Sequence, residues 1–257
     1  WRMVAPAFAL ALAVAPGRAT PAAPPTLVVL AGQSNALGYG VEPKDLPAAW
    51  KEDPSVRIWR NGRFETLSPG RNTGTPRNPR AWGPEVGFAL AWRRSHPQGE
   101  LDIVKVAKGS TGLAADPRAL DWSPRSRELY ADTTAQAAAA QRASGAPVAA
   151  ILWMQGEEDA VSGAKAAAYG ANLTAFVRAA RRDWGDAPVV LGRIGAAARE
   201  AHAAQVRRAQ AEVARTEPRI RMVDTDAFPV QSDRLHLDAR GQLALGYAMA
   251  RALEPAP

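Results

Sequence analysis

The chain has 257 residues, a formal net charge of +7 and no cysteine. This length allows one large α/β domain whose core needs no disulfide or metal to hold it together. The lack of cysteine excludes disulfides, a thiol nucleophile and thiolate metal ligands. Most of the positive charge comes from arginines scattered along alanine-rich stretches, with no nucleic-acid motif beside them, so we expect no nucleic-acid partner.

The first two dozen residues follow the pattern of a secretory signal. Arg2 precedes an apolar stretch over residues 4–15, and small residues follow over 16–23. The apolar stretch is too short to span a bilayer. We therefore expect a signal peptide and leader over residues 1–23, a secreted or periplasmic protein without a membrane span, and one domain over residues 24–257. A disordered Ala/Pro leader is the alternative, and the start at Trp1 leaves the true N-terminus open.

Strand-like and helix-like segments alternate along the rest of the chain. The expected strands are at 26–30, 101–107, 147–154, 188–191 and 221–224. The expected helices are at 83–95, 128–143, 164–183, 196–216 and 239–253. Because parallel strands need crossover connections that are usually helical, this alternation predicts a three-layer α/β/α sandwich around a five-stranded parallel sheet.

Two segments between the first and second of these strands differ from the alternating pattern. Residues 56–59 are strand-like, and Asn61-Gly62 then precedes Phe64, which is a strong signal for a tight hairpin. We expect a small antiparallel excursion there. Residues 67–80 are rich in Gly, Pro, Asn and Arg, which predicts a long surface loop.

Polar residues that suit catalysis follow the predicted strands. Ser34 comes just after the first strand, Gln155 ends the strand at 147–154, and Asp233 and His236 lie in the loop after the last strand. The carboxyl ends of parallel strands meet at one edge of a sheet, where ligands bind. Asp233 and His236 are three residues apart, so on one helical turn the carboxylate would hold the imidazole in one tautomer.

Ester hydrolysis by serine needs a nucleophile, a base, an orienting acid and donors for the oxyanion. Each residue also has a structural interpretation by itself: Ser34 as a helix cap, Gln155 as a strand-end cap, and His236 as an exposed loop residue. Their occurrence together, each at a predicted strand end, favours a catalytic site. The pattern is not the Gly-x-Ser-x-Gly elbow, because Ala36 replaces the second glycine.

At these residues the sequence resembles the SGNH hydrolase superfamily, and most closely its sialate O-acetylesterase and acetylxylan esterase branch, carbohydrate esterase family six. The resemblance rests on Gly32-Gln33-Ser34-Asn35, on Gly109 after a strand, on the segments 155–159 and 233–236, and on Trp82-Gly83-Pro84-Glu85. It spans roughly residues 26–253 and implies the flavodoxin-like SGNH hydrolase fold.

The resemblance also implies roles for single residues. Ser34 would be the nucleophile, His236 the general base, and Asp233 the acid that orients it. The oxyanion hole would consist of the backbone N–H groups of Ser34 and Gly109 and the side-chain amide of Gln155.

Contacts to the substrate are less defined by the sequence. We consider Asn35, Glu157 and Arg193 as substrate-binding candidates, although Asn35 could instead tie the nucleophile turn to a neighbouring loop. For Glu157 a structural role in the Gln155 turn is the alternative. Three arginines of the surface loop could grip a carboxylated sugar or simply be solvated: Arg71, Arg77 and Arg80.

These observations predict a serine esterase that removes O-acetyl groups from carbohydrates, such as acetylated sialic acid, xylan or a related glycan, through an acetyl-serine intermediate. We expect no cofactor and no metal site. One alternative is a lipase, aryl esterase or thioesterase of the same superfamily, although these usually carry Gly-Asp-Ser at the nucleophile. The other is a non-catalytic carbohydrate-binding module. The sequence does not specify the sugar, the acetylated position or the oligomeric state.

Overall fold

The computed structural model describes residues 1, 23–126, 128–196, 198 and 200–254. The expected leader over residues 1–23 lies, apart from its two ends, outside these ranges. The described elements, with η for short 3-10 helices, are β1 (Thr26–Gly32), α1 (Ser34–Leu37), η1 (Pro43–Asp45), β2 (Val56–Arg60), β3 (Arg63–Thr66), α2 (Pro84–Ser95), β4 (Leu101–Ala107), α3 (Leu129–Ser144), β5 (Val148–Met154), η2 (Asp159–Val161), α4 (Gly163–Trp184), β6 (Val189–Gly192), α5 (Ala203–Thr216), β7 (Ile220–Val223) and α6 (Ala239–Arg251).

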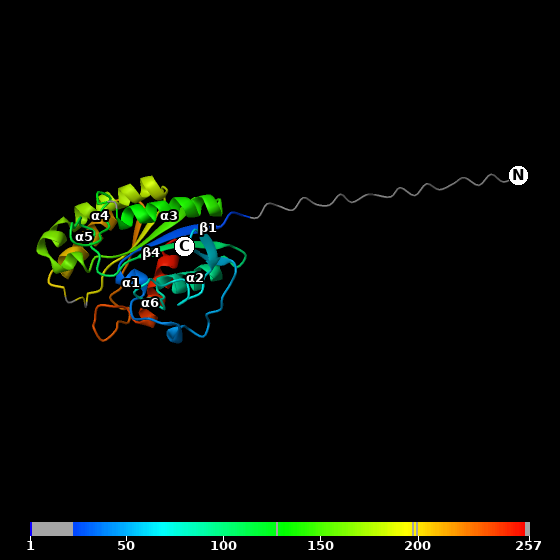
Figure 1. Ribbon diagram of the computed structural model, residues 1–257, viewed down its shortest axis with the longest axis horizontal. Coiled ribbons are helices and arrows are strands. Elements are labelled where there is room, and N and C mark those ends of the chain that lie inside the picture. Colours follow the sequence, from blue (N-terminus) through cyan, green and yellow to red (C-terminus); the bar gives the residue numbers. More distant parts are fainter. Residues whose placement is uncertain (2–22, 127, 197, 199, 255–257) are drawn as a thin grey trace.

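The strands form one sheet in the order β3-β2-β4-β1-β5-β6-β7, with every neighbouring pair parallel except β2 and β3 (Figure 1). The expectation of a five-stranded sheet is wrong, because the sheet has seven strands. The predicted hairpin is present, with Asn61 and Gly62 at φ 50° and 80° as such a turn requires. Its first strand pairs with β4, opposite Leu101 to Ile103, and so extends the sheet by two strands.

Helices cover both faces of the sheet, which confirms the three-layer arrangement (Figure 1). Helices α3, α4 and α5 lie on one face, and α1, α2 and α6 on the other. Helix α6 packs directly on α2. A Cβ atom at Gly246 would lie 2.1 Å from the Pro84 carbonyl oxygen, so the absence of a side chain permits this close approach of the two backbones.

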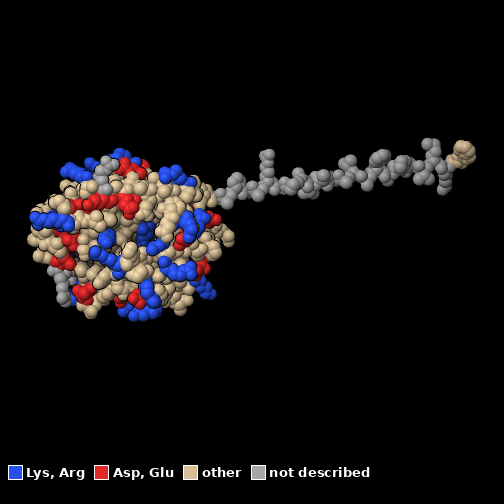
Figure 2. Space-filling model, viewed as in Figure 1, with Lys and Arg blue, Asp and Glu red and all other residues tan. Residues whose placement is uncertain are grey.

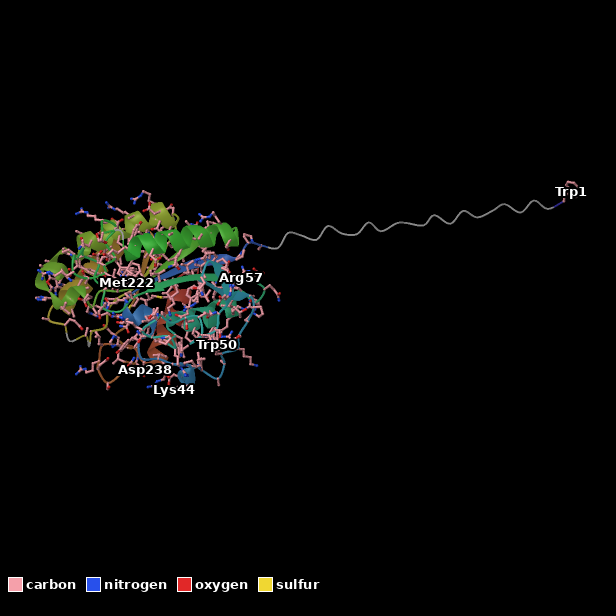
Figure 3. The ribbon with its side chains drawn as sticks, in the orientation of Figure 1. Trp1, Lys44, Trp50, Arg57, Met222 and Asp238 are labelled. Carbon is pink, nitrogen blue, oxygen red and sulfur yellow. The ribbon has the colours of Figure 1, made fainter. Side chains whose placement is uncertain are left out.

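The hydrophobic core lies on both faces of β1, whose residues 27–31 are fully buried, as expected for the central strand of a parallel sheet. Side chains fill the space between the ribbons (Figure 3). Trp122 and Trp153 are in the core and pack edge to face at 5.1 Å between ring centroids. Trp82 is also fully buried, so these tryptophans are core residues rather than exposed sugar platforms.

The predicted helices agree with the observed ones except at one boundary. Helix α5 begins at Ala203, not near residue 196, because His202 precedes it with a non-helical backbone and its N–H donates to the carbonyl of Ala160. Helix α6 begins as predicted at Ala239, and its N-cap Asp238, labelled in Figure 3, accepts a hydrogen bond from Gly241 N–H. No helix in the described ranges has the length and apolar character needed to cross a membrane.

Basic and acidic side chains are intermixed on the face shown in Figure 2. Two exposed arginines pair with carboxylates on their own helices: Arg182 with Asp183, and Arg215 with Glu212. This distribution agrees with the interpretation that the arginines mainly form solvated helix faces.

Candidate active site

Ser34, the candidate nucleophile, lies just after the carboxyl end of the central strand β1. It is the first residue of helix α1. Gly32 just before it has φ 144°, and a Cβ there would lie 2.0 Å from the Met154 carbonyl oxygen, so this position excludes a side chain. The side-chain oxygen of Gln33 accepts hydrogen bonds from the N–H groups of Gly156 and Glu158. The turn that carries Ser34 is thereby fastened to the end of β5.

Asp233 and His236 are in direct contact in the loop between β7 and α6. His236 Nδ1 and Asp233 Oδ2 are 2.7 Å apart. The two residues do not share a helical turn as expected, because Arg234 between them has φ 60°. The contact arises instead from a tight turn in which Asp233 Oδ1 accepts hydrogen bonds from the N–H groups of Leu235 and His236.

The Asp233 carboxyl is held in its ionised form. Partial burial raises its pKa, but the hydrogen bonds from the His236 ring and from the N–H groups of His236 and Leu235 outweigh this effect and lower the pKa to about 2. An ionised acceptor at Nδ1 keeps the proton of a neutral imidazole on that nitrogen. His236 Nε2 is then the nitrogen available to take a proton.

Ser34, Gly109 and His236 line one pocket of about 270 Å3. These three residues lie near the beginning, middle and end of the chain, and they meet because each follows the end of a strand. A Cβ at Gly109 would lie 3.8 Å from Ser34 Cβ, so the two residues are neighbours in the pocket. The hydrogen bonds of the described residues leave the N–H groups of Ser34 and Gly109 without a protein acceptor. Both are therefore free to donate to an oxygen in the pocket.

No hydrogen bond joins Ser34 to His236 among the described contacts. Long nucleophile-to-base separations are common in free enzymes and shorten when substrate binds. The His236 ring also packs against Tyr39, with 4.5 Å between ring centroids. Tyr39 is thus part of the wall that holds the imidazole.

Gln155 lies at the end of β5 as predicted, but it is fully buried and does not line this pocket. Its Nε2 donates to Asp159 Oδ2 at 2.6 Å and to the Thr111 carbonyl at 3.1 Å, which uses both amide hydrogens. Its Oε1 accepts from the Tyr169 hydroxyl. The place of Gln155 in an oxyanion hole stays a prediction, and it would require the loss of one of the two donated bonds.

Asn35 and Glu157 do not line the pocket, and their expected contact with substrate stays a prediction. Both are buried, and Asn35 Nδ2 donates to Glu157 Oε1 at 2.7 Å. Asn35 also donates to the Leu235 carbonyl and accepts from Leu237 N–H, on the two sides of His236. Asn35 therefore ties the nucleophile turn to the histidine loop, which is the structural role considered for it above.

Arg193 follows β6 and does not line the pocket either, so its role in substrate binding also stays a prediction. Its guanidinium binds the carboxylates of Asp224 and Asp226, at 2.5 Å and 3.1 Å. These carboxylates follow β7, so the arginine links the ends of the last two strands. A position after a strand was not sufficient to predict contact with the pocket, because β6 is two strands away from β1.

A buried ion pair supports α1, the short helix that begins at Ser34. Lys105 Nζ lies 2.8 Å from Glu85 Oε2 and donates to the carbonyl of Leu37 at the end of α1. Glu85 Oε1 accepts from Gly83 N–H, which accounts for the Trp82-Gly83-Pro84-Glu85 segment as a support of the site. Burial lowers the pKa of Lys105, which Glu85 opposes.

The pocket is also lined by residues for which the sequence did not favour a role in substrate binding. Arg77 and Asn78 come from the long loop, and Lys108 precedes Gly109. Arg77 is exposed, and no carboxylate in the described residues pairs with it or with Lys108. The arginine-rich composition of the loop was the available signal, but it did not distinguish Arg77 from its neighbours.

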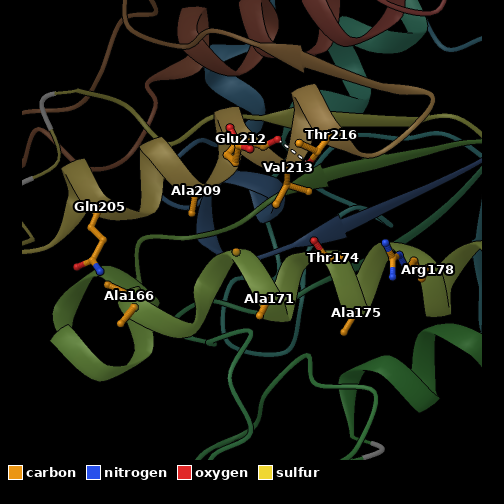
Figure 4. A pocket seen from close by; sticks show the side chains of 12 residues that line it. Ala166, Ala171, Thr174, Ala175, Arg178, Gln205, Ala209, Glu212, Val213 and Thr216 are labelled. Atoms are coloured by element: carbon orange, nitrogen blue, oxygen red, sulfur yellow. Dashed lines mark hydrogen bonds between the residues drawn. The ribbon is translucent and has the colours of Figure 1, made fainter.

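A larger hollow of about 620 Å3 lies between α4 and α5 (Figure 4). Its walls are mainly small side chains, such as Ala171 and Ala175 of α4 and Ala209 of α5. It contains no histidine and none of the residues at the strand ends. Within the described ranges, no three His, Asp or Glu side chains are grouped closely enough to hold a metal ion.

This chain is similar to known carbohydrate esterases. The family model described as carbohydrate esterase, sialic acid-specific acetylesterase, matches residues 24–254. A probable carbohydrate esterase of Arabidopsis thaliana is 26% identical, in an alignment that covers 91% of this chain and 92% of that protein. The family match confirms the resemblance to the sialate O-acetylesterase branch.

Solved structures share the fold. The structure of a protein from Arabidopsis thaliana has a TM-score of 0.79 at 24% identity, covering 90% of this chain and 98% of that chain. The structure of NanS has a TM-score of 0.67 at 18% identity, covering 89% of this chain and 96% of that chain. These likenesses confirm the predicted α/β fold class.

Proposed function

The chain belongs to the carbohydrate esterase family of sialic acid-specific acetylesterases and is a carboxylic ester hydrolase, and we propose that it removes O-acetyl groups from carbohydrates through an acetyl-serine intermediate. The observation that carries the proposal is the pocket shared by Ser34, Gly109 and His236, with Asp233 bound to the far nitrogen of the imidazole.

In the first half of the reaction, His236 Nε2 takes the proton of the Ser34 hydroxyl as its oxygen bonds to the acetyl carbonyl carbon. The negative charge passes to the carbonyl oxygen, which accepts hydrogen bonds from the N–H groups of Ser34 and Gly109. The tetrahedral intermediate then breaks its bond to the sugar oxygen. His236 gives its proton to that oxygen, and the sugar leaves with a free hydroxyl.

In the second half, a water molecule replaces the sugar. His236 takes one proton from the water, whose oxygen bonds to the acetyl carbon. The bond to Ser34 then breaks, the proton on His236 passes to the serine oxygen, and acetic acid leaves and gives its remaining proton to the solvent. Asp233 remains ionised throughout and stabilises the charged imidazolium in each half.

Charge in the pocket favours an acidic sugar as the substrate. Arg77 and Lys108 both line it, and no acidic residue is among its described lining residues. Arginine binds carboxylates with two parallel hydrogen bonds. We therefore rank acetylated sialic acid above acetylated xylan, which carries no carboxylate on its xylose units.

The decisive experiment measures acetate release by wild type and by Ser34→Ala, using acetylated N-acetylneuraminic acid, acetylated xylan and p-nitrophenyl acetate. We expect the variant to lose roughly 10⁴-fold or more of kcat on each substrate that wild type hydrolyses. Ser110→Gly is the matched control, because it removes another pocket hydroxyl at a residue with φ 55°, which glycine accepts readily. Undiminished acetate release by Ser34→Ala would refute the proposed mechanism.

We also propose that residues 1–23 direct export, since Arg2 and the apolar stretch after it match a secretory signal. N-terminal sequencing of the protein recovered outside the cytoplasm is the test. A recovered chain that still begins before residue 16 would contradict cleavage in this segment.

A further inference from the structure

A second hollow adjoins the catalytic pocket. Its volume is about 230 Å3, and it shares the side chains of Arg77 and Asn78 with the pocket of Ser34. Each hollow by itself is smaller than most small-molecule sites, which occupy about 300–1,000 Å3, whereas the two together fall in that range. The residues that line the second hollow are Gly40, Val41, Glu42, Arg77, Asn78, Pro79, Arg80 and Ala81.

The walls of this hollow are held in place by hydrogen bonds to the body of the protein. Trp82 Nε1 donates to the Glu42 carbonyl at 2.7 Å, which fixes one wall. On the other wall Thr75 and Asn78 exchange two backbone hydrogen bonds, and the Ala81 carbonyl accepts from the Thr73 hydroxyl. The hollow is therefore a formed feature of the surface, although its loop has no regular secondary structure.

Its polar groups suit the hydroxyl groups of a sugar. Arg80 Nε and Glu42 Oε2 are 3.9 Å apart, too far for a hydrogen bond, and the side chains are 63% and 47% exposed, so each can still bind a ligand. Arginine supplies only donors and an ionised carboxylate only acceptors. Sugar hydroxyls donate and accept, and neighbouring hydroxyls can use both groups at once.

A third hollow adjoins the second. It has a volume of about 290 Å3 and shares Gly40 and Val41 with the second. The second hollow thus shares residues with the catalytic pocket and with the third hollow. A ligand that occupies more than one of these hollows is a chain of sugars rather than a single ring.

We propose that the second hollow is a subsite for the sugar residue next to the acetylated one, so that the enzyme prefers acetylated oligosaccharides to acetylated monosaccharides. This inference rests on the proposed function. It assigns Arg80, which does not line the catalytic pocket, to the binding of the neighbouring sugar.

The test compares kcat/KM for matched pairs of esters: acetylated N-acetylneuraminic acid against acetylated sialyllactose, and acetylated xylose against acetylated xylobiose. We expect wild type to favour the longer member of the pair that it hydrolyses by about fivefold or more. Arg80→Ala should reduce that preference to about twofold or less, since a hydrogen bond to a charged group is lost. Arg71→Ala is the matched control, because Arg71 is an exposed arginine of the same loop that lines neither hollow.

Equal kcat/KM for both members of each pair in wild type would overturn the subsite, as would an Arg80→Ala variant that keeps the wild-type preference. Either result leaves the esterase function intact. A different outcome, in which p-nitrophenyl acetate is hydrolysed but no sugar ester is, would overturn the proposed carbohydrate function and the subsite with it.

Discussion

We expect the free energy of unfolding to depend on pH because of Glu157. Its side chain is buried behind the catalytic pocket, with one oxygen accepting from Asn35 and the other, Oε2, without a partner in the described structure. Burial raises the pKa of Glu157 to about 7. The nearby carboxylates of Glu200 and Asp159 contribute in the same direction, and the hydrogen bond from Asn35 opposes the rise. The folded protein therefore keeps a proton on Glu157 at pH values where the unfolded chain has lost it.

The sign and size of the effect follow from that difference. In the unfolded chain the carboxyl titrates near its ordinary value of 4.5, and in the folded protein near 7. Between these values the folded state binds more protons, so its free energy of unfolding falls as the pH rises, and the loss is complete above about pH 7. At about 1.36 kcal/mol for each pH unit, the interval corresponds to about 3 kcal/mol.

Glu157→Gln removes the titration and keeps an oxygen that can accept from Asn35. The free energy of unfolding is measured by urea denaturation at several pH values between 5 and 8. We expect the variant to gain about 2.5 kcal/mol relative to wild type as the pH rises across this range, because part of the effect already occurs below pH 5. The new amide nitrogen lacks an acceptor, but the cost of its burial does not vary with pH and cancels in the comparison.

Glu212→Gln is the control, because Glu212 is a largely exposed carboxylate on α5. Its stability should parallel wild type at every pH. If Glu157→Gln also parallels wild type from pH 5 to pH 8, then Glu157 is ionised in the folded protein and the reasoning from burial is refuted.

Two further predictions concern the groups that position Ser34 and His236. Lys105→Met leaves the Glu85 carboxylate buried without its cation, so we expect the free energy of unfolding to fall by about 3–5 kcal/mol, and the double variant with Glu85→Gln to recover most of the loss. Denaturation curves of the three proteins measure this, and a loss below about 1 kcal/mol in the single variant would contradict it. Asp233→Asn removes the ionised acceptor at the imidazole, and we expect kcat on p-nitrophenyl acetate at pH 7 to fall roughly 10³- to 10⁴-fold. A kcat close to wild type would mean that another group orients His236.

The sequence alone determined the features that depend on neighbouring residues. The strands, the helices and the Asn61-Gly62 hairpin follow from short-range patterns of apolar and turn-forming residues, and the structure contains them all. The contact between Asp233 and His236 is also local, since it needs only the backbone between them, although that backbone forms a tight turn rather than a helical turn. The order of strand ends was sufficient to bring Ser34 and His236 into one pocket.

Only the tertiary structure decided which side chains behind and around that pocket meet. Asn35 and Glu157 are 122 residues apart, and their hydrogen bond depends on how the turns after β1 and β5 pack together. For the same reason the sequence could not tell that Arg77 faces the pocket and that Arg193 does not. Short-range patterns fix the path of the backbone, whereas the partners of a polar side chain depend on which loops converge at one edge of the sheet.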